Sequence, residues 1–219
     1  MDVLQTIKRL FVPLVSEVDD DLVPAPFTVY AIHPLTEKHI KEVLRLNLRC
    51  FKDGENYTKH TFAYLLNEPG TLSYKAVTAD DEIVGFVFVM VNANGAAHLT
   101  TIGVAPEHRR RRLAERLLDH MDNALRKRGI NTIMLEVRVG NIAAQNLYRR
   151  VGYTVVQRIE NYYSNGEDCF LMKVHIPAMD QLDRILDCFL IYGSTTTSII
   201  QSSPVPLRPP PLPGEEIES

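Results

Sequence analysis

The chain has 219 residues, of which 23% are charged, and its formal net charge is −3 at pH 7. This length suits one domain with a full hydrophobic core plus short extensions, and the acidic balance argues against a general nucleic-acid binder, which would usually be basic. Three cysteines without a CxxC spacing and seven histidines without a metal-ligand pattern predict neither a disulfide framework nor a metal site, so we expect a metal-free protein of the reducing cytoplasm.

An extension is predicted ahead of the main domain, over residues 1–26. Apolar residues recur in it at helical spacing, and an acidic run and two prolines follow them. The apolar stretch is shorter than the roughly 20 residues of a membrane span and lacks the cleavage site of a signal peptide. We therefore expect an amphipathic helix and a linker, packed either on the domain or on a partner.

The main domain is predicted over residues 27–175 as a mixed α/β structure. Strands are expected at 27–32, 73–78, 83–91, 97–104, 132–139, 154–159 and 169–174, with helices from Thr36 to Cys50, at 58–66, from Leu113 onwards and after Asn141. The segment 83–91 is almost continuously apolar, which is typical of a central strand covered on both faces. This order of elements predicts a mixed central sheet flanked by helices on both faces.

Four consecutive arginines, residues 109–112, stand at the entrance of the helix that begins near Leu113. The N-terminus of a helix is partly positive, so cations are unusual in its first turn. The arrangement makes sense if an anion binds there, because free backbone N–H groups and guanidinium groups together suit phosphate or pyrophosphate. The alternative is a solvated basic loop.

The arginine loop is one of several motifs that occur in a fixed order along the chain. They are residues 104–106 and 109–114, then 135–138 with Asn141, Ala144, Leu147, Tyr148 and Gly152, then 161–163 and 166–168. In order and spacing they resemble the GNAT superfamily of acetyl-CoA-dependent N-acetyltransferases. Within it the chain looks most like the protein N-terminal acetyltransferases, which include the ribosomal-protein-alanine enzymes. The resemblance covers roughly residues 27–175 and implies the GNAT fold, with acetyl-CoA as the cosubstrate.

The resemblance also implies where the cosubstrate binds. The pantetheine arm would enter between two strands that splay apart, and Gly103 would ease its approach to the backbone. Asn141 would contact the cosubstrate from the next helix, beside its ordinary role as a helix N-cap. The implied cofactor-binding residues are Ile102, Gly103, Val104, Arg109, Arg110, Arg111, Arg112, Leu113, Ala114 and Asn141.

One position departs from the pyrophosphate loop of the family. That loop reads Gln or Arg, two residues, Gly, one residue, and Gly or Ala, and Arg112 stands at the glycine position. Glycine permits a close approach of the backbone and a positive φ. A side chain there is expected to narrow the approach or to require a slightly different loop path. An α-helical φ would be open to Arg112, and its charge would offset the lost space.

The reaction implied by the resemblance is direct attack of a free amine on the thioester carbonyl. An α-amino group has a pKa of roughly 7.7 to 8, so it must lose a proton to react and a base is required. Glu136 is the first candidate, because burial in its apolar strand would raise its pKa; an ion pair with Arg138 is the alternative. His98 is the second candidate, and it shares a face with Ile102 and Val104 if no bulge intervenes. A purely structural histidine is the alternative there.

The resemblance also implies a general acid and a set of substrate-binding residues. Tyr148 is the candidate general acid for the departing thiolate, unless it serves only as an aromatic core anchor. Glu55 would meet the cationic amine of the substrate, or it is a solvated turn acid, and Tyr57 would pack beside it. In the family, the tyrosine pair Tyr162 and Tyr163 borders the substrate peptide.

Beyond the domain we expect an amphipathic helix at 176–192 and a proline-rich tail at 193–219 that is disordered or forms polyproline II. The extensions leave open a homodimer or a contact with another partner. The predicted function is acetyl transfer to the α-amine of a protein N-terminus, a ribosomal protein included, without nucleic acid or membrane. The alternatives are a GNAT enzyme acting on a small amine or a lysine side chain, and a non-catalytic acyl-CoA-binding module.

Overall fold

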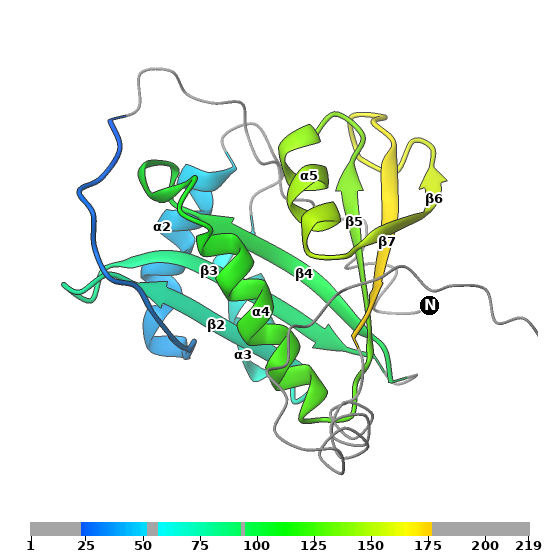
Figure 1. The fold of residues 1–219 in the computed structure, drawn as a ribbon. Coiled ribbons are helices and arrows are strands. Elements are labelled where there is room, and N and C mark those ends of the chain that lie inside the picture. The colour runs from blue at the N-terminus through cyan, green and yellow to red at the C-terminus, as the bar shows by residue number, and fades with distance from the viewer. Residues whose placement is uncertain (1–22, 52–56, 93–94, 177–219) are drawn as a thin grey trace, which may run out of the picture. The chain divides into compact units, whose positions relative to one another are not determined.

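The computed structural model describes residues 23–51, 57–92 and 95–176 (Figure 1). The elements follow in chain order: β1 (Ala31–Pro34), the 3-10 turn η1 (Glu37–His39), α2 (Ile40–Cys50), α3 (Lys59–Asn67), β2 (Thr71–Val77), β3 (Ile83–Val91), β4 (Ala97–Val104), the 3-10 turn η2 (Pro106–His108), α4 (Leu113–Arg126), β5 (Thr132–Arg138), α5 (Ile142–Arg150), β6 (Thr154–Ile159) and β7 (Cys169–His175). The predicted order of strands and helices is confirmed. The helices expected in the N-terminal extension and at 176–192, and the tail at 193–219, lie outside the described residues, apart from Ile176.

The strands form one seven-stranded sheet in the order β1-β2-β3-β4-β5-β7-β6. Among the described strands, β4 and β5 are the parallel pair and the other neighbours are antiparallel. The mixed sheet is therefore confirmed. The last strand, β7, does not lie at the edge, because it inserts between β5 and β6 and pairs with both.

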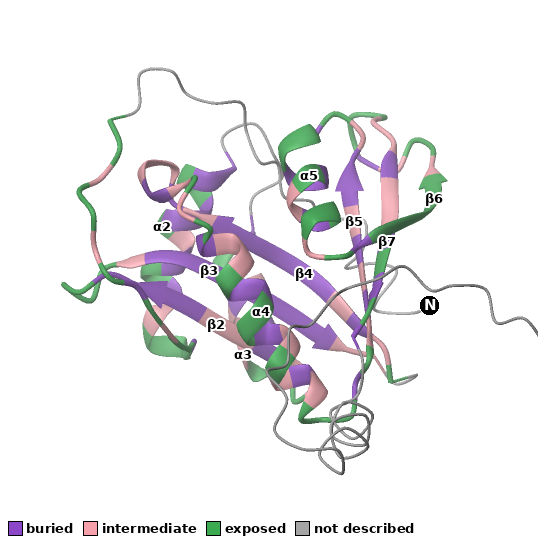
Figure 2. Ribbon diagram, in the orientation of Figure 1, coloured by how far each residue is buried: buried purple, intermediate pink, exposed green. Residues whose placement is uncertain are grey.

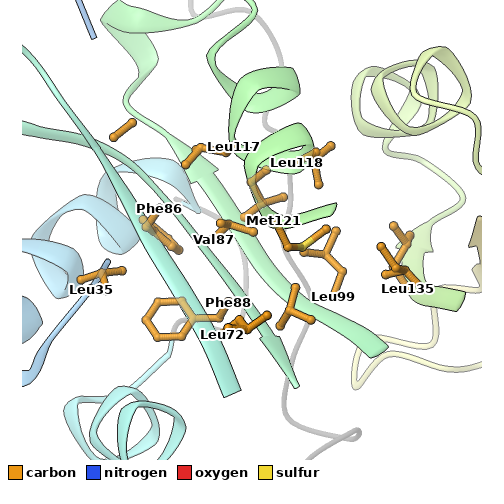
Figure 3. Packing of buried hydrophobic residues seen from close by; sticks show 14 of the residues in the cluster. Leu35, Leu72, Phe86, Val87, Phe88, Leu99, Leu117, Leu118, Met121 and Leu135 are labelled. Atoms are coloured by element: carbon orange, nitrogen blue, oxygen red, sulfur yellow. The ribbon is translucent and has the colours of Figure 1, made fainter. Parts of the chain in front are cut away.

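The core is organised around β3, which is buried along almost its whole length (Figure 2). On one face, the ring of Phe62 from α3 lies 6.0 Å from the ring of Phe86 and 5.3 Å from that of Phe88. On the other face, α4 packs so closely that a Cβ at Gly85 would lie 3.2 Å from Cδ1 of Leu117. Figure 3 shows these two layers of side chains on either side of the strands. The expected central strand, covered on both faces, is confirmed.

Helices cover both faces of the sheet, as predicted. Figure 1 shows α4 and α5 on one face and α2 and α3 on the opposite face. The turn that follows α5 packs on β7, where a Cβ at Gly152 would lie 3.7 Å from Cγ2 of Val174. Within the described part of the chain, no helix combines the length and the apolar character needed to cross a bilayer.

The first strand begins later than the sequence predicts. The expected strand at 27–32 is β1, which spans Ala31–Pro34, and the residues before it run without regular secondary structure. Their carbonyl groups accept hydrogen bonds from arginine side chains: Arg111 donates to Pro26 at 2.8 Å and Arg116 to Tyr30 at 2.8 Å. A pattern of apolar residues cannot reveal such partners, which lie far away in the sequence.

Candidate active site

The parallel strands β4 and β5 separate soon after they meet. Both strands lie fully within the described residues, and their ladder joins Ala97 to Ile133 and His98 to Met134 before it ends. Beyond His98 the strands diverge (Figure 1). The expected splay is therefore confirmed. It leaves this edge of β4 unpaired with β5 over the stretch where the pantetheine arm was expected.

The two candidate bases meet at this divergence. Nε2 of His98 lies 2.6 Å from Oε2 of Glu136, and the two side chains are 15% and 12% exposed. His98 is the last residue of β4 that pairs with β5, and its partner there is Met134. Glu136 lies two residues beyond Met134 on β5. The expected alternative, an ion pair between Glu136 and Arg138, gives way to this contact.

A β-bulge in β4 sets the direction of His98. The ladder to β3 shifts its register and leaves Thr100 as an extra residue. His98 therefore shares a face with Gly103, while Ile102 points to the other face. This corrects the expected grouping of His98 with Ile102 and Val104, which required a strand without a bulge. Bulges often redirect side chains beside active sites, and this one places His98 on the face covered by α2 and α3.

Tyr57 holds the bulge from the chain segment just before α3. Its hydroxyl donates a hydrogen bond to the carbonyl oxygen of Thr100 at 2.8 Å, and its ring stacks on Phe62. Tyr57 is 2% exposed, and its burial, followed by the charge of Glu136, raises its pKa. Tyr57 therefore belongs to the buried residues that support the strand carrying His98, close enough to Glu136 to respond to its charge. Glu55, its expected companion, lies outside the described residues.

The tyrosine pair lies in the turn between β6 and β7, near Glu136. The rings of Tyr162 and Tyr163 are 4.9 Å apart and almost perpendicular. Burial, followed by the charge of Glu136, raises the pKa of Tyr162, and burial followed by Cys169 raises that of Tyr163. The family resemblance implies that both tyrosines border the substrate. In the structure both are close enough to Glu136 for its charge to raise their pKa.

An ion pair holds this turn in place. Nη1 of Arg138 donates to Oε2 of Glu167 at 2.7 Å, and its guanidinium lies 3.9 Å from the ring centre of Tyr163. The other carboxylate oxygen of Glu167 accepts from the backbone N–H of Gly140 at 3.0 Å. Although burial opposes ionisation, the hydrogen bonds from Arg138 and Gly140 lower the pKa of Glu167. Sequence reasoning noted the motif at 166–168 but gave Glu167 no role.

The backbone of the arginine loop differs from the sequence expectation. Arg112 is the N-cap residue of α4, with φ 56° and ψ 19°, so its conformation is left-handed and not α-helical. Arg110 also has a positive φ, of 63°. The loop thus follows the path that glycine favours, although arginines occupy it. Left-handed backbone costs a non-glycine residue about 1 to 2 kcal/mol.

The four arginines of this loop face different surroundings. Arg109 donates from Nε to the carbonyl of Val104 at 3.2 Å and from Nη2 to that of Cys50 at 3.4 Å. Arg111 turns toward the segment ahead of β1, whereas Arg110 and Arg112 are exposed. The loop therefore does not present four equivalent guanidinium groups.

Other expected cofactor-binding residues serve the core as well. A Cβ at Gly103 would lie 2.7 Å from Cε1 of Phe86, so the missing side chain makes room for Phe86. Ile102 is buried, and Leu113 is buried at the start of α4, followed by the half-buried Ala114. These residues therefore offer backbone groups more readily than side chains to a ligand.

Asn141 and Tyr148 lie on α5, which packs on the face of β5 opposite Glu136. Oδ1 of Asn141 accepts from the backbone N–H of Ala144 at 3.0 Å, so its N-cap role is confirmed. Tyr148 is buried, with its ring 5.6 Å from that of Tyr153, and burial raises its pKa. Tyr148 therefore keeps its proton at neutral pH.

A surface hollow on α4 stands apart from these residues. It has a volume of about 310 Å³ and is lined by Ile32, Arg116, Asp119, His120 and Asn123. None of these residues belongs to the pair of candidate bases or to the tyrosine turn. Across the described ranges, no three His, Cys, Asp or Glu side chains gather in an arrangement that would hold a metal ion.

Comparisons with known proteins agree with this geometry. The model of the Acetyltransferase (GNAT) family matches residues 40–153. The chain is 37% identical over 103 residues to the [ribosomal protein bS18]-alanine N-acetyltransferase of Salmonella typhimurium, which covers 46% of this chain and 69% of that protein. It is 25% identical over 143 residues to N-alpha-acetyltransferase 30 of Schizosaccharomyces pombe, covering 64% of this chain and 93% of that one.

A solved structure shares the fold. The crystal structure of the ribosomal-protein-S18-alanine N-acetyltransferase from Escherichia coli superposes with a TM-score of 0.60 at 29% identity, over 68% of this chain and 94% of that chain. The family match extends over more than half of the sequence and includes both diverging strands. The chain therefore belongs to the acetyltransferase (GNAT) family, and it is an N-acetyltransferase enzyme.

Proposed function

We propose that this enzyme transfers the acetyl group of acetyl-CoA to the free α-amine of a protein N-terminus. The observation that carries the proposal is the His98–Glu136 pair at the point where β4 and β5 diverge, with Tyr162 close to the same carboxylate. The proposed proton acceptor and the turn proposed to border the peptide are thus close to one another. Tyr148, the proposed partner of the departing sulfur, belongs to α5 on the other face of the sheet.

The chain offers groups that suit acetyl-CoA. The cosubstrate supplies the activated acetyl thioester. The β4 backbone at Ile102, Gly103 and Val104, which has no ladder partner in β5, would hold the pantetheine arm. The N-terminus of α4 and the exposed guanidinium groups of Arg110 and Arg112 would face the phosphates. In this proposal Asn141 adds a contact from α5.

Glu136 is the proposed proton acceptor. At neutral pH most α-amino groups are protonated, since their pKa is roughly 7.7 to 8, so a proton must leave before the nitrogen can attack. The contact with Nε2 of His98 at 2.6 Å holds the carboxylate in one orientation. His98 is the second group through which the proton can move.

Tyr148 is the proposed hydrogen-bond donor to the departing sulfur. A thiol has a pKa of roughly 8.5 and an ordinary tyrosine roughly 10. Burial raises the pKa of Tyr148 further, so complete transfer of its proton to a thiolate would be uphill. We therefore assign to Tyr148 the donation of a hydrogen bond to the thiolate, while solvent supplies the proton.

Direct attack is preferred over an acetylated cysteine. Burial raises the pKa of Cys50 and that of Cys169 to about 12, which keeps both thiols protonated and unreactive at neutral pH. A location in the reducing cytoplasm stays a prediction.

A protein N-terminus is the proposed acceptor because the compared relatives carry that activity in their names. A ribosomal protein is one candidate substrate. Glu55, Tyr57, Tyr162 and Tyr163 are the proposed substrate-side residues, with Tyr57 acting through its support of the strand that carries His98. Contacts of the terminal extensions with a second copy or a partner stay a prediction.

The test is acetyl transfer to a panel of short peptides that differ in their first two residues, alanine-initiated peptides among them. Each peptide is paired with a version whose N-terminus is blocked and which carries a lysine. CoA release gives the rate, and mass spectrometry gives the modified atom. Acetylation of free N-termini alone is expected. Acetylation of the blocked peptides at lysine, or of small amines only, would reject the proposed acceptor.

A further inference from the structure

A short segment ahead of the domain is bound to the arginine loop. We call residues 25–30, drawn in blue ahead of β1 in Figure 1, the strap. The backbone N–H of Ala25 donates to the carbonyl of Glu107 at 3.0 Å. Arg111 donates to the carbonyl groups of Ala25 and Pro26, and its guanidinium lies 5.2 Å from the ring centre of Phe27. The strap thus contacts both η2 and the loop that leads into α4.

A buried hydrogen-bond relay closes the strap. Nη1 of Arg111 lies 2.9 Å from the hydroxyl oxygen of Tyr30, and that oxygen lies 2.9 Å from Nδ1 of His108. Arginine can only donate, so the Tyr30 oxygen accepts from Arg111, and its O–H is available to donate to Nδ1 of a neutral His108. Burial lowers the pKa of His108, which favours the neutral ring that this acceptor role needs.

The loop is also held by the C-terminal end of α2. The guanidinium of Arg109 donates to the carbonyl of Cys50 at the end of α2, and Arg49 from the same helix lies 2.5 Å from the carboxylate of Glu107. The loop therefore lies between two sets of contacts. The strap supplies one set, and the C-terminal end of α2 supplies the other.

This double attachment accounts for an otherwise unfavourable backbone. Arg110 and Arg112 both have left-handed φ values, and Arg111 lies between them. Such residues persist only where their surroundings over-determine them. Arg112 receives no side-chain cap contact of its own at the start of α4. The contacts of Arg111 with the strap are therefore the restraint nearest to both strained residues.

We propose that Tyr30 and Arg111 are positioning residues: with the strap they hold the loop at 109–112 in the shape that presents its backbone N–H groups and the Arg110 and Arg112 side chains to the phosphates of acetyl-CoA. Arg111 acts through the loop and does not itself contact the phosphates. The identity of the ligand rests on the proposed function, whereas the attachment of the loop does not. Weakening the contacts of the strap should therefore weaken CoA binding and leave the KM for the peptide unchanged.

The sharpest variant is Tyr30→Phe, because it breaks the relay without changing any charge. Its matched control is Tyr64→Phe, at an exposed tyrosine on α3. The dissociation constant of CoA, measured by calorimetry, and the KM for acetyl-CoA should rise about 3- to 10-fold, as expected for the loss of one hydrogen bond. The KM for the peptide should stay unchanged. Amide hydrogen exchange at residues 109–113 should become faster in Tyr30→Phe and not in the control.

A second variant separates positioning from direct contact. Arg111→Met removes the guanidinium, with Arg45→Met on the exposed face of α2 as its control. If Arg111 only positions the loop, Arg111→Met and Tyr30→Phe weaken CoA binding and speed loop exchange together. If Arg111→Met weakens CoA binding while Tyr30→Phe leaves affinity and exchange unchanged, the proposal is wrong and Arg111 turns to the phosphate itself. Should the unaltered protein bind no CoA, the proposed function fails, yet the exchange rates still decide whether the strap holds the loop.

Discussion

Nε2 of His98 lies 2.6 Å from Oε2 of Glu136, although the two residues belong to different strands that separate immediately beyond this contact. The pair exists because the strands are parallel and share one paired position at His98, and because the bulge at Thr100 turns His98 to the face of Glu136. A change to either partner should therefore act on the chemistry before it acts on the fold.

Glu136→Gln should lower kcat about 10²- to 10⁴-fold, the range typical for the loss of a general base. Glutamine keeps the size of the side chain but cannot take a proton from the amine. The affinity for CoA should remain unchanged, because Glu136 lies on the face of the sheet that we propose for the peptide. Steady-state kinetics and calorimetry test this, with the exposed Glu42→Gln as the matched control. Unchanged turnover in Glu136→Gln would remove the base assignment.

Glu167→Gln should loosen the tyrosine turn. The substitution leaves the buried Arg138 without its ionic partner, which should destabilise the fold by about 1 to 3 kcal/mol and raise the KM for the peptide. The pKa of Glu167 is lowered in the folded state, so its contribution is present above the ordinary carboxyl pKa and is lost as the pH falls through the lowered value.

Urea unfolding at pH 7 and at pH 3 measures this difference. The matched control is Glu115→Gln, whose ion pair with Arg150 is more exposed and should be worth less than about 1 kcal/mol. A loss of stability in Glu167→Gln that is equal at both pH values would contradict an ionic contribution. An unchanged peptide KM would show that the turn does not depend on this pair.

Asp122 should make the fold less stable at higher pH. Burial raises the pKa of this α4 carboxyl to about 7, although Arg126 opposes the shift. An acid with a raised folded-state pKa contributes stability that is present below its ordinary pKa, near 4, and is lost as the pH rises toward 7. Asp122→Asn should therefore raise the stability at pH 8 by about 1 to 3 kcal/mol, less than the full shift implies because the group retains some contact with water.

Thermal unfolding between pH 4 and pH 8 tests this expectation. The exposed Asp80→Asn, in the turn between β2 and β3, is the control, and its melting temperature should follow that of the unaltered protein. Parallel pH profiles for Asp122→Asn and the unaltered protein would be the contrary outcome.

Gly103→Ala should destabilise the core by about 1 to 3 kcal/mol, because the new methyl group would lie 2.7 Å from the Phe86 ring. Phe86→Leu in the same chain should recover part of the loss by removing the ring. Denaturant unfolding of the two single variants and the double variant gives the coupling energy. Strict additivity would mean that Gly103 serves another purpose than making room for Phe86.

Much of the fold could be read from the sequence because its signals are local. The bounds of β3 and β4 follow from apolar runs punctuated by turn residues, and the order of elements follows from alternating strand and helix periods. The motif residues also led to Glu136 and His98 before their contact was known. Strand bounds and motifs of this kind can be recognised from residues that are close together in the sequence.

What the sequence could not reveal depends on distant partners. The bulge at Thr100 is held by a hydroxyl from Tyr57, 43 residues away, and alternation along β4 gives no sign of it. The left-handed Arg112 was missed because arginine rarely adopts that conformation without restraint. The late start of β1 was missed because Arg111 and Arg116, more than 80 residues away, donate to the carbonyl groups of Pro26 and Tyr30 ahead of it.

The strap lies at 25–30, whereas the family match begins at residue 40. The loop before α4 thus lies inside the matched stretch, whereas part of what it contacts lies ahead of that stretch. A boundary drawn at the first strand would cut the molecule through a hydrogen-bonded unit. The segment ahead of β1 is accordingly better treated as a structural part of the domain than as a linker.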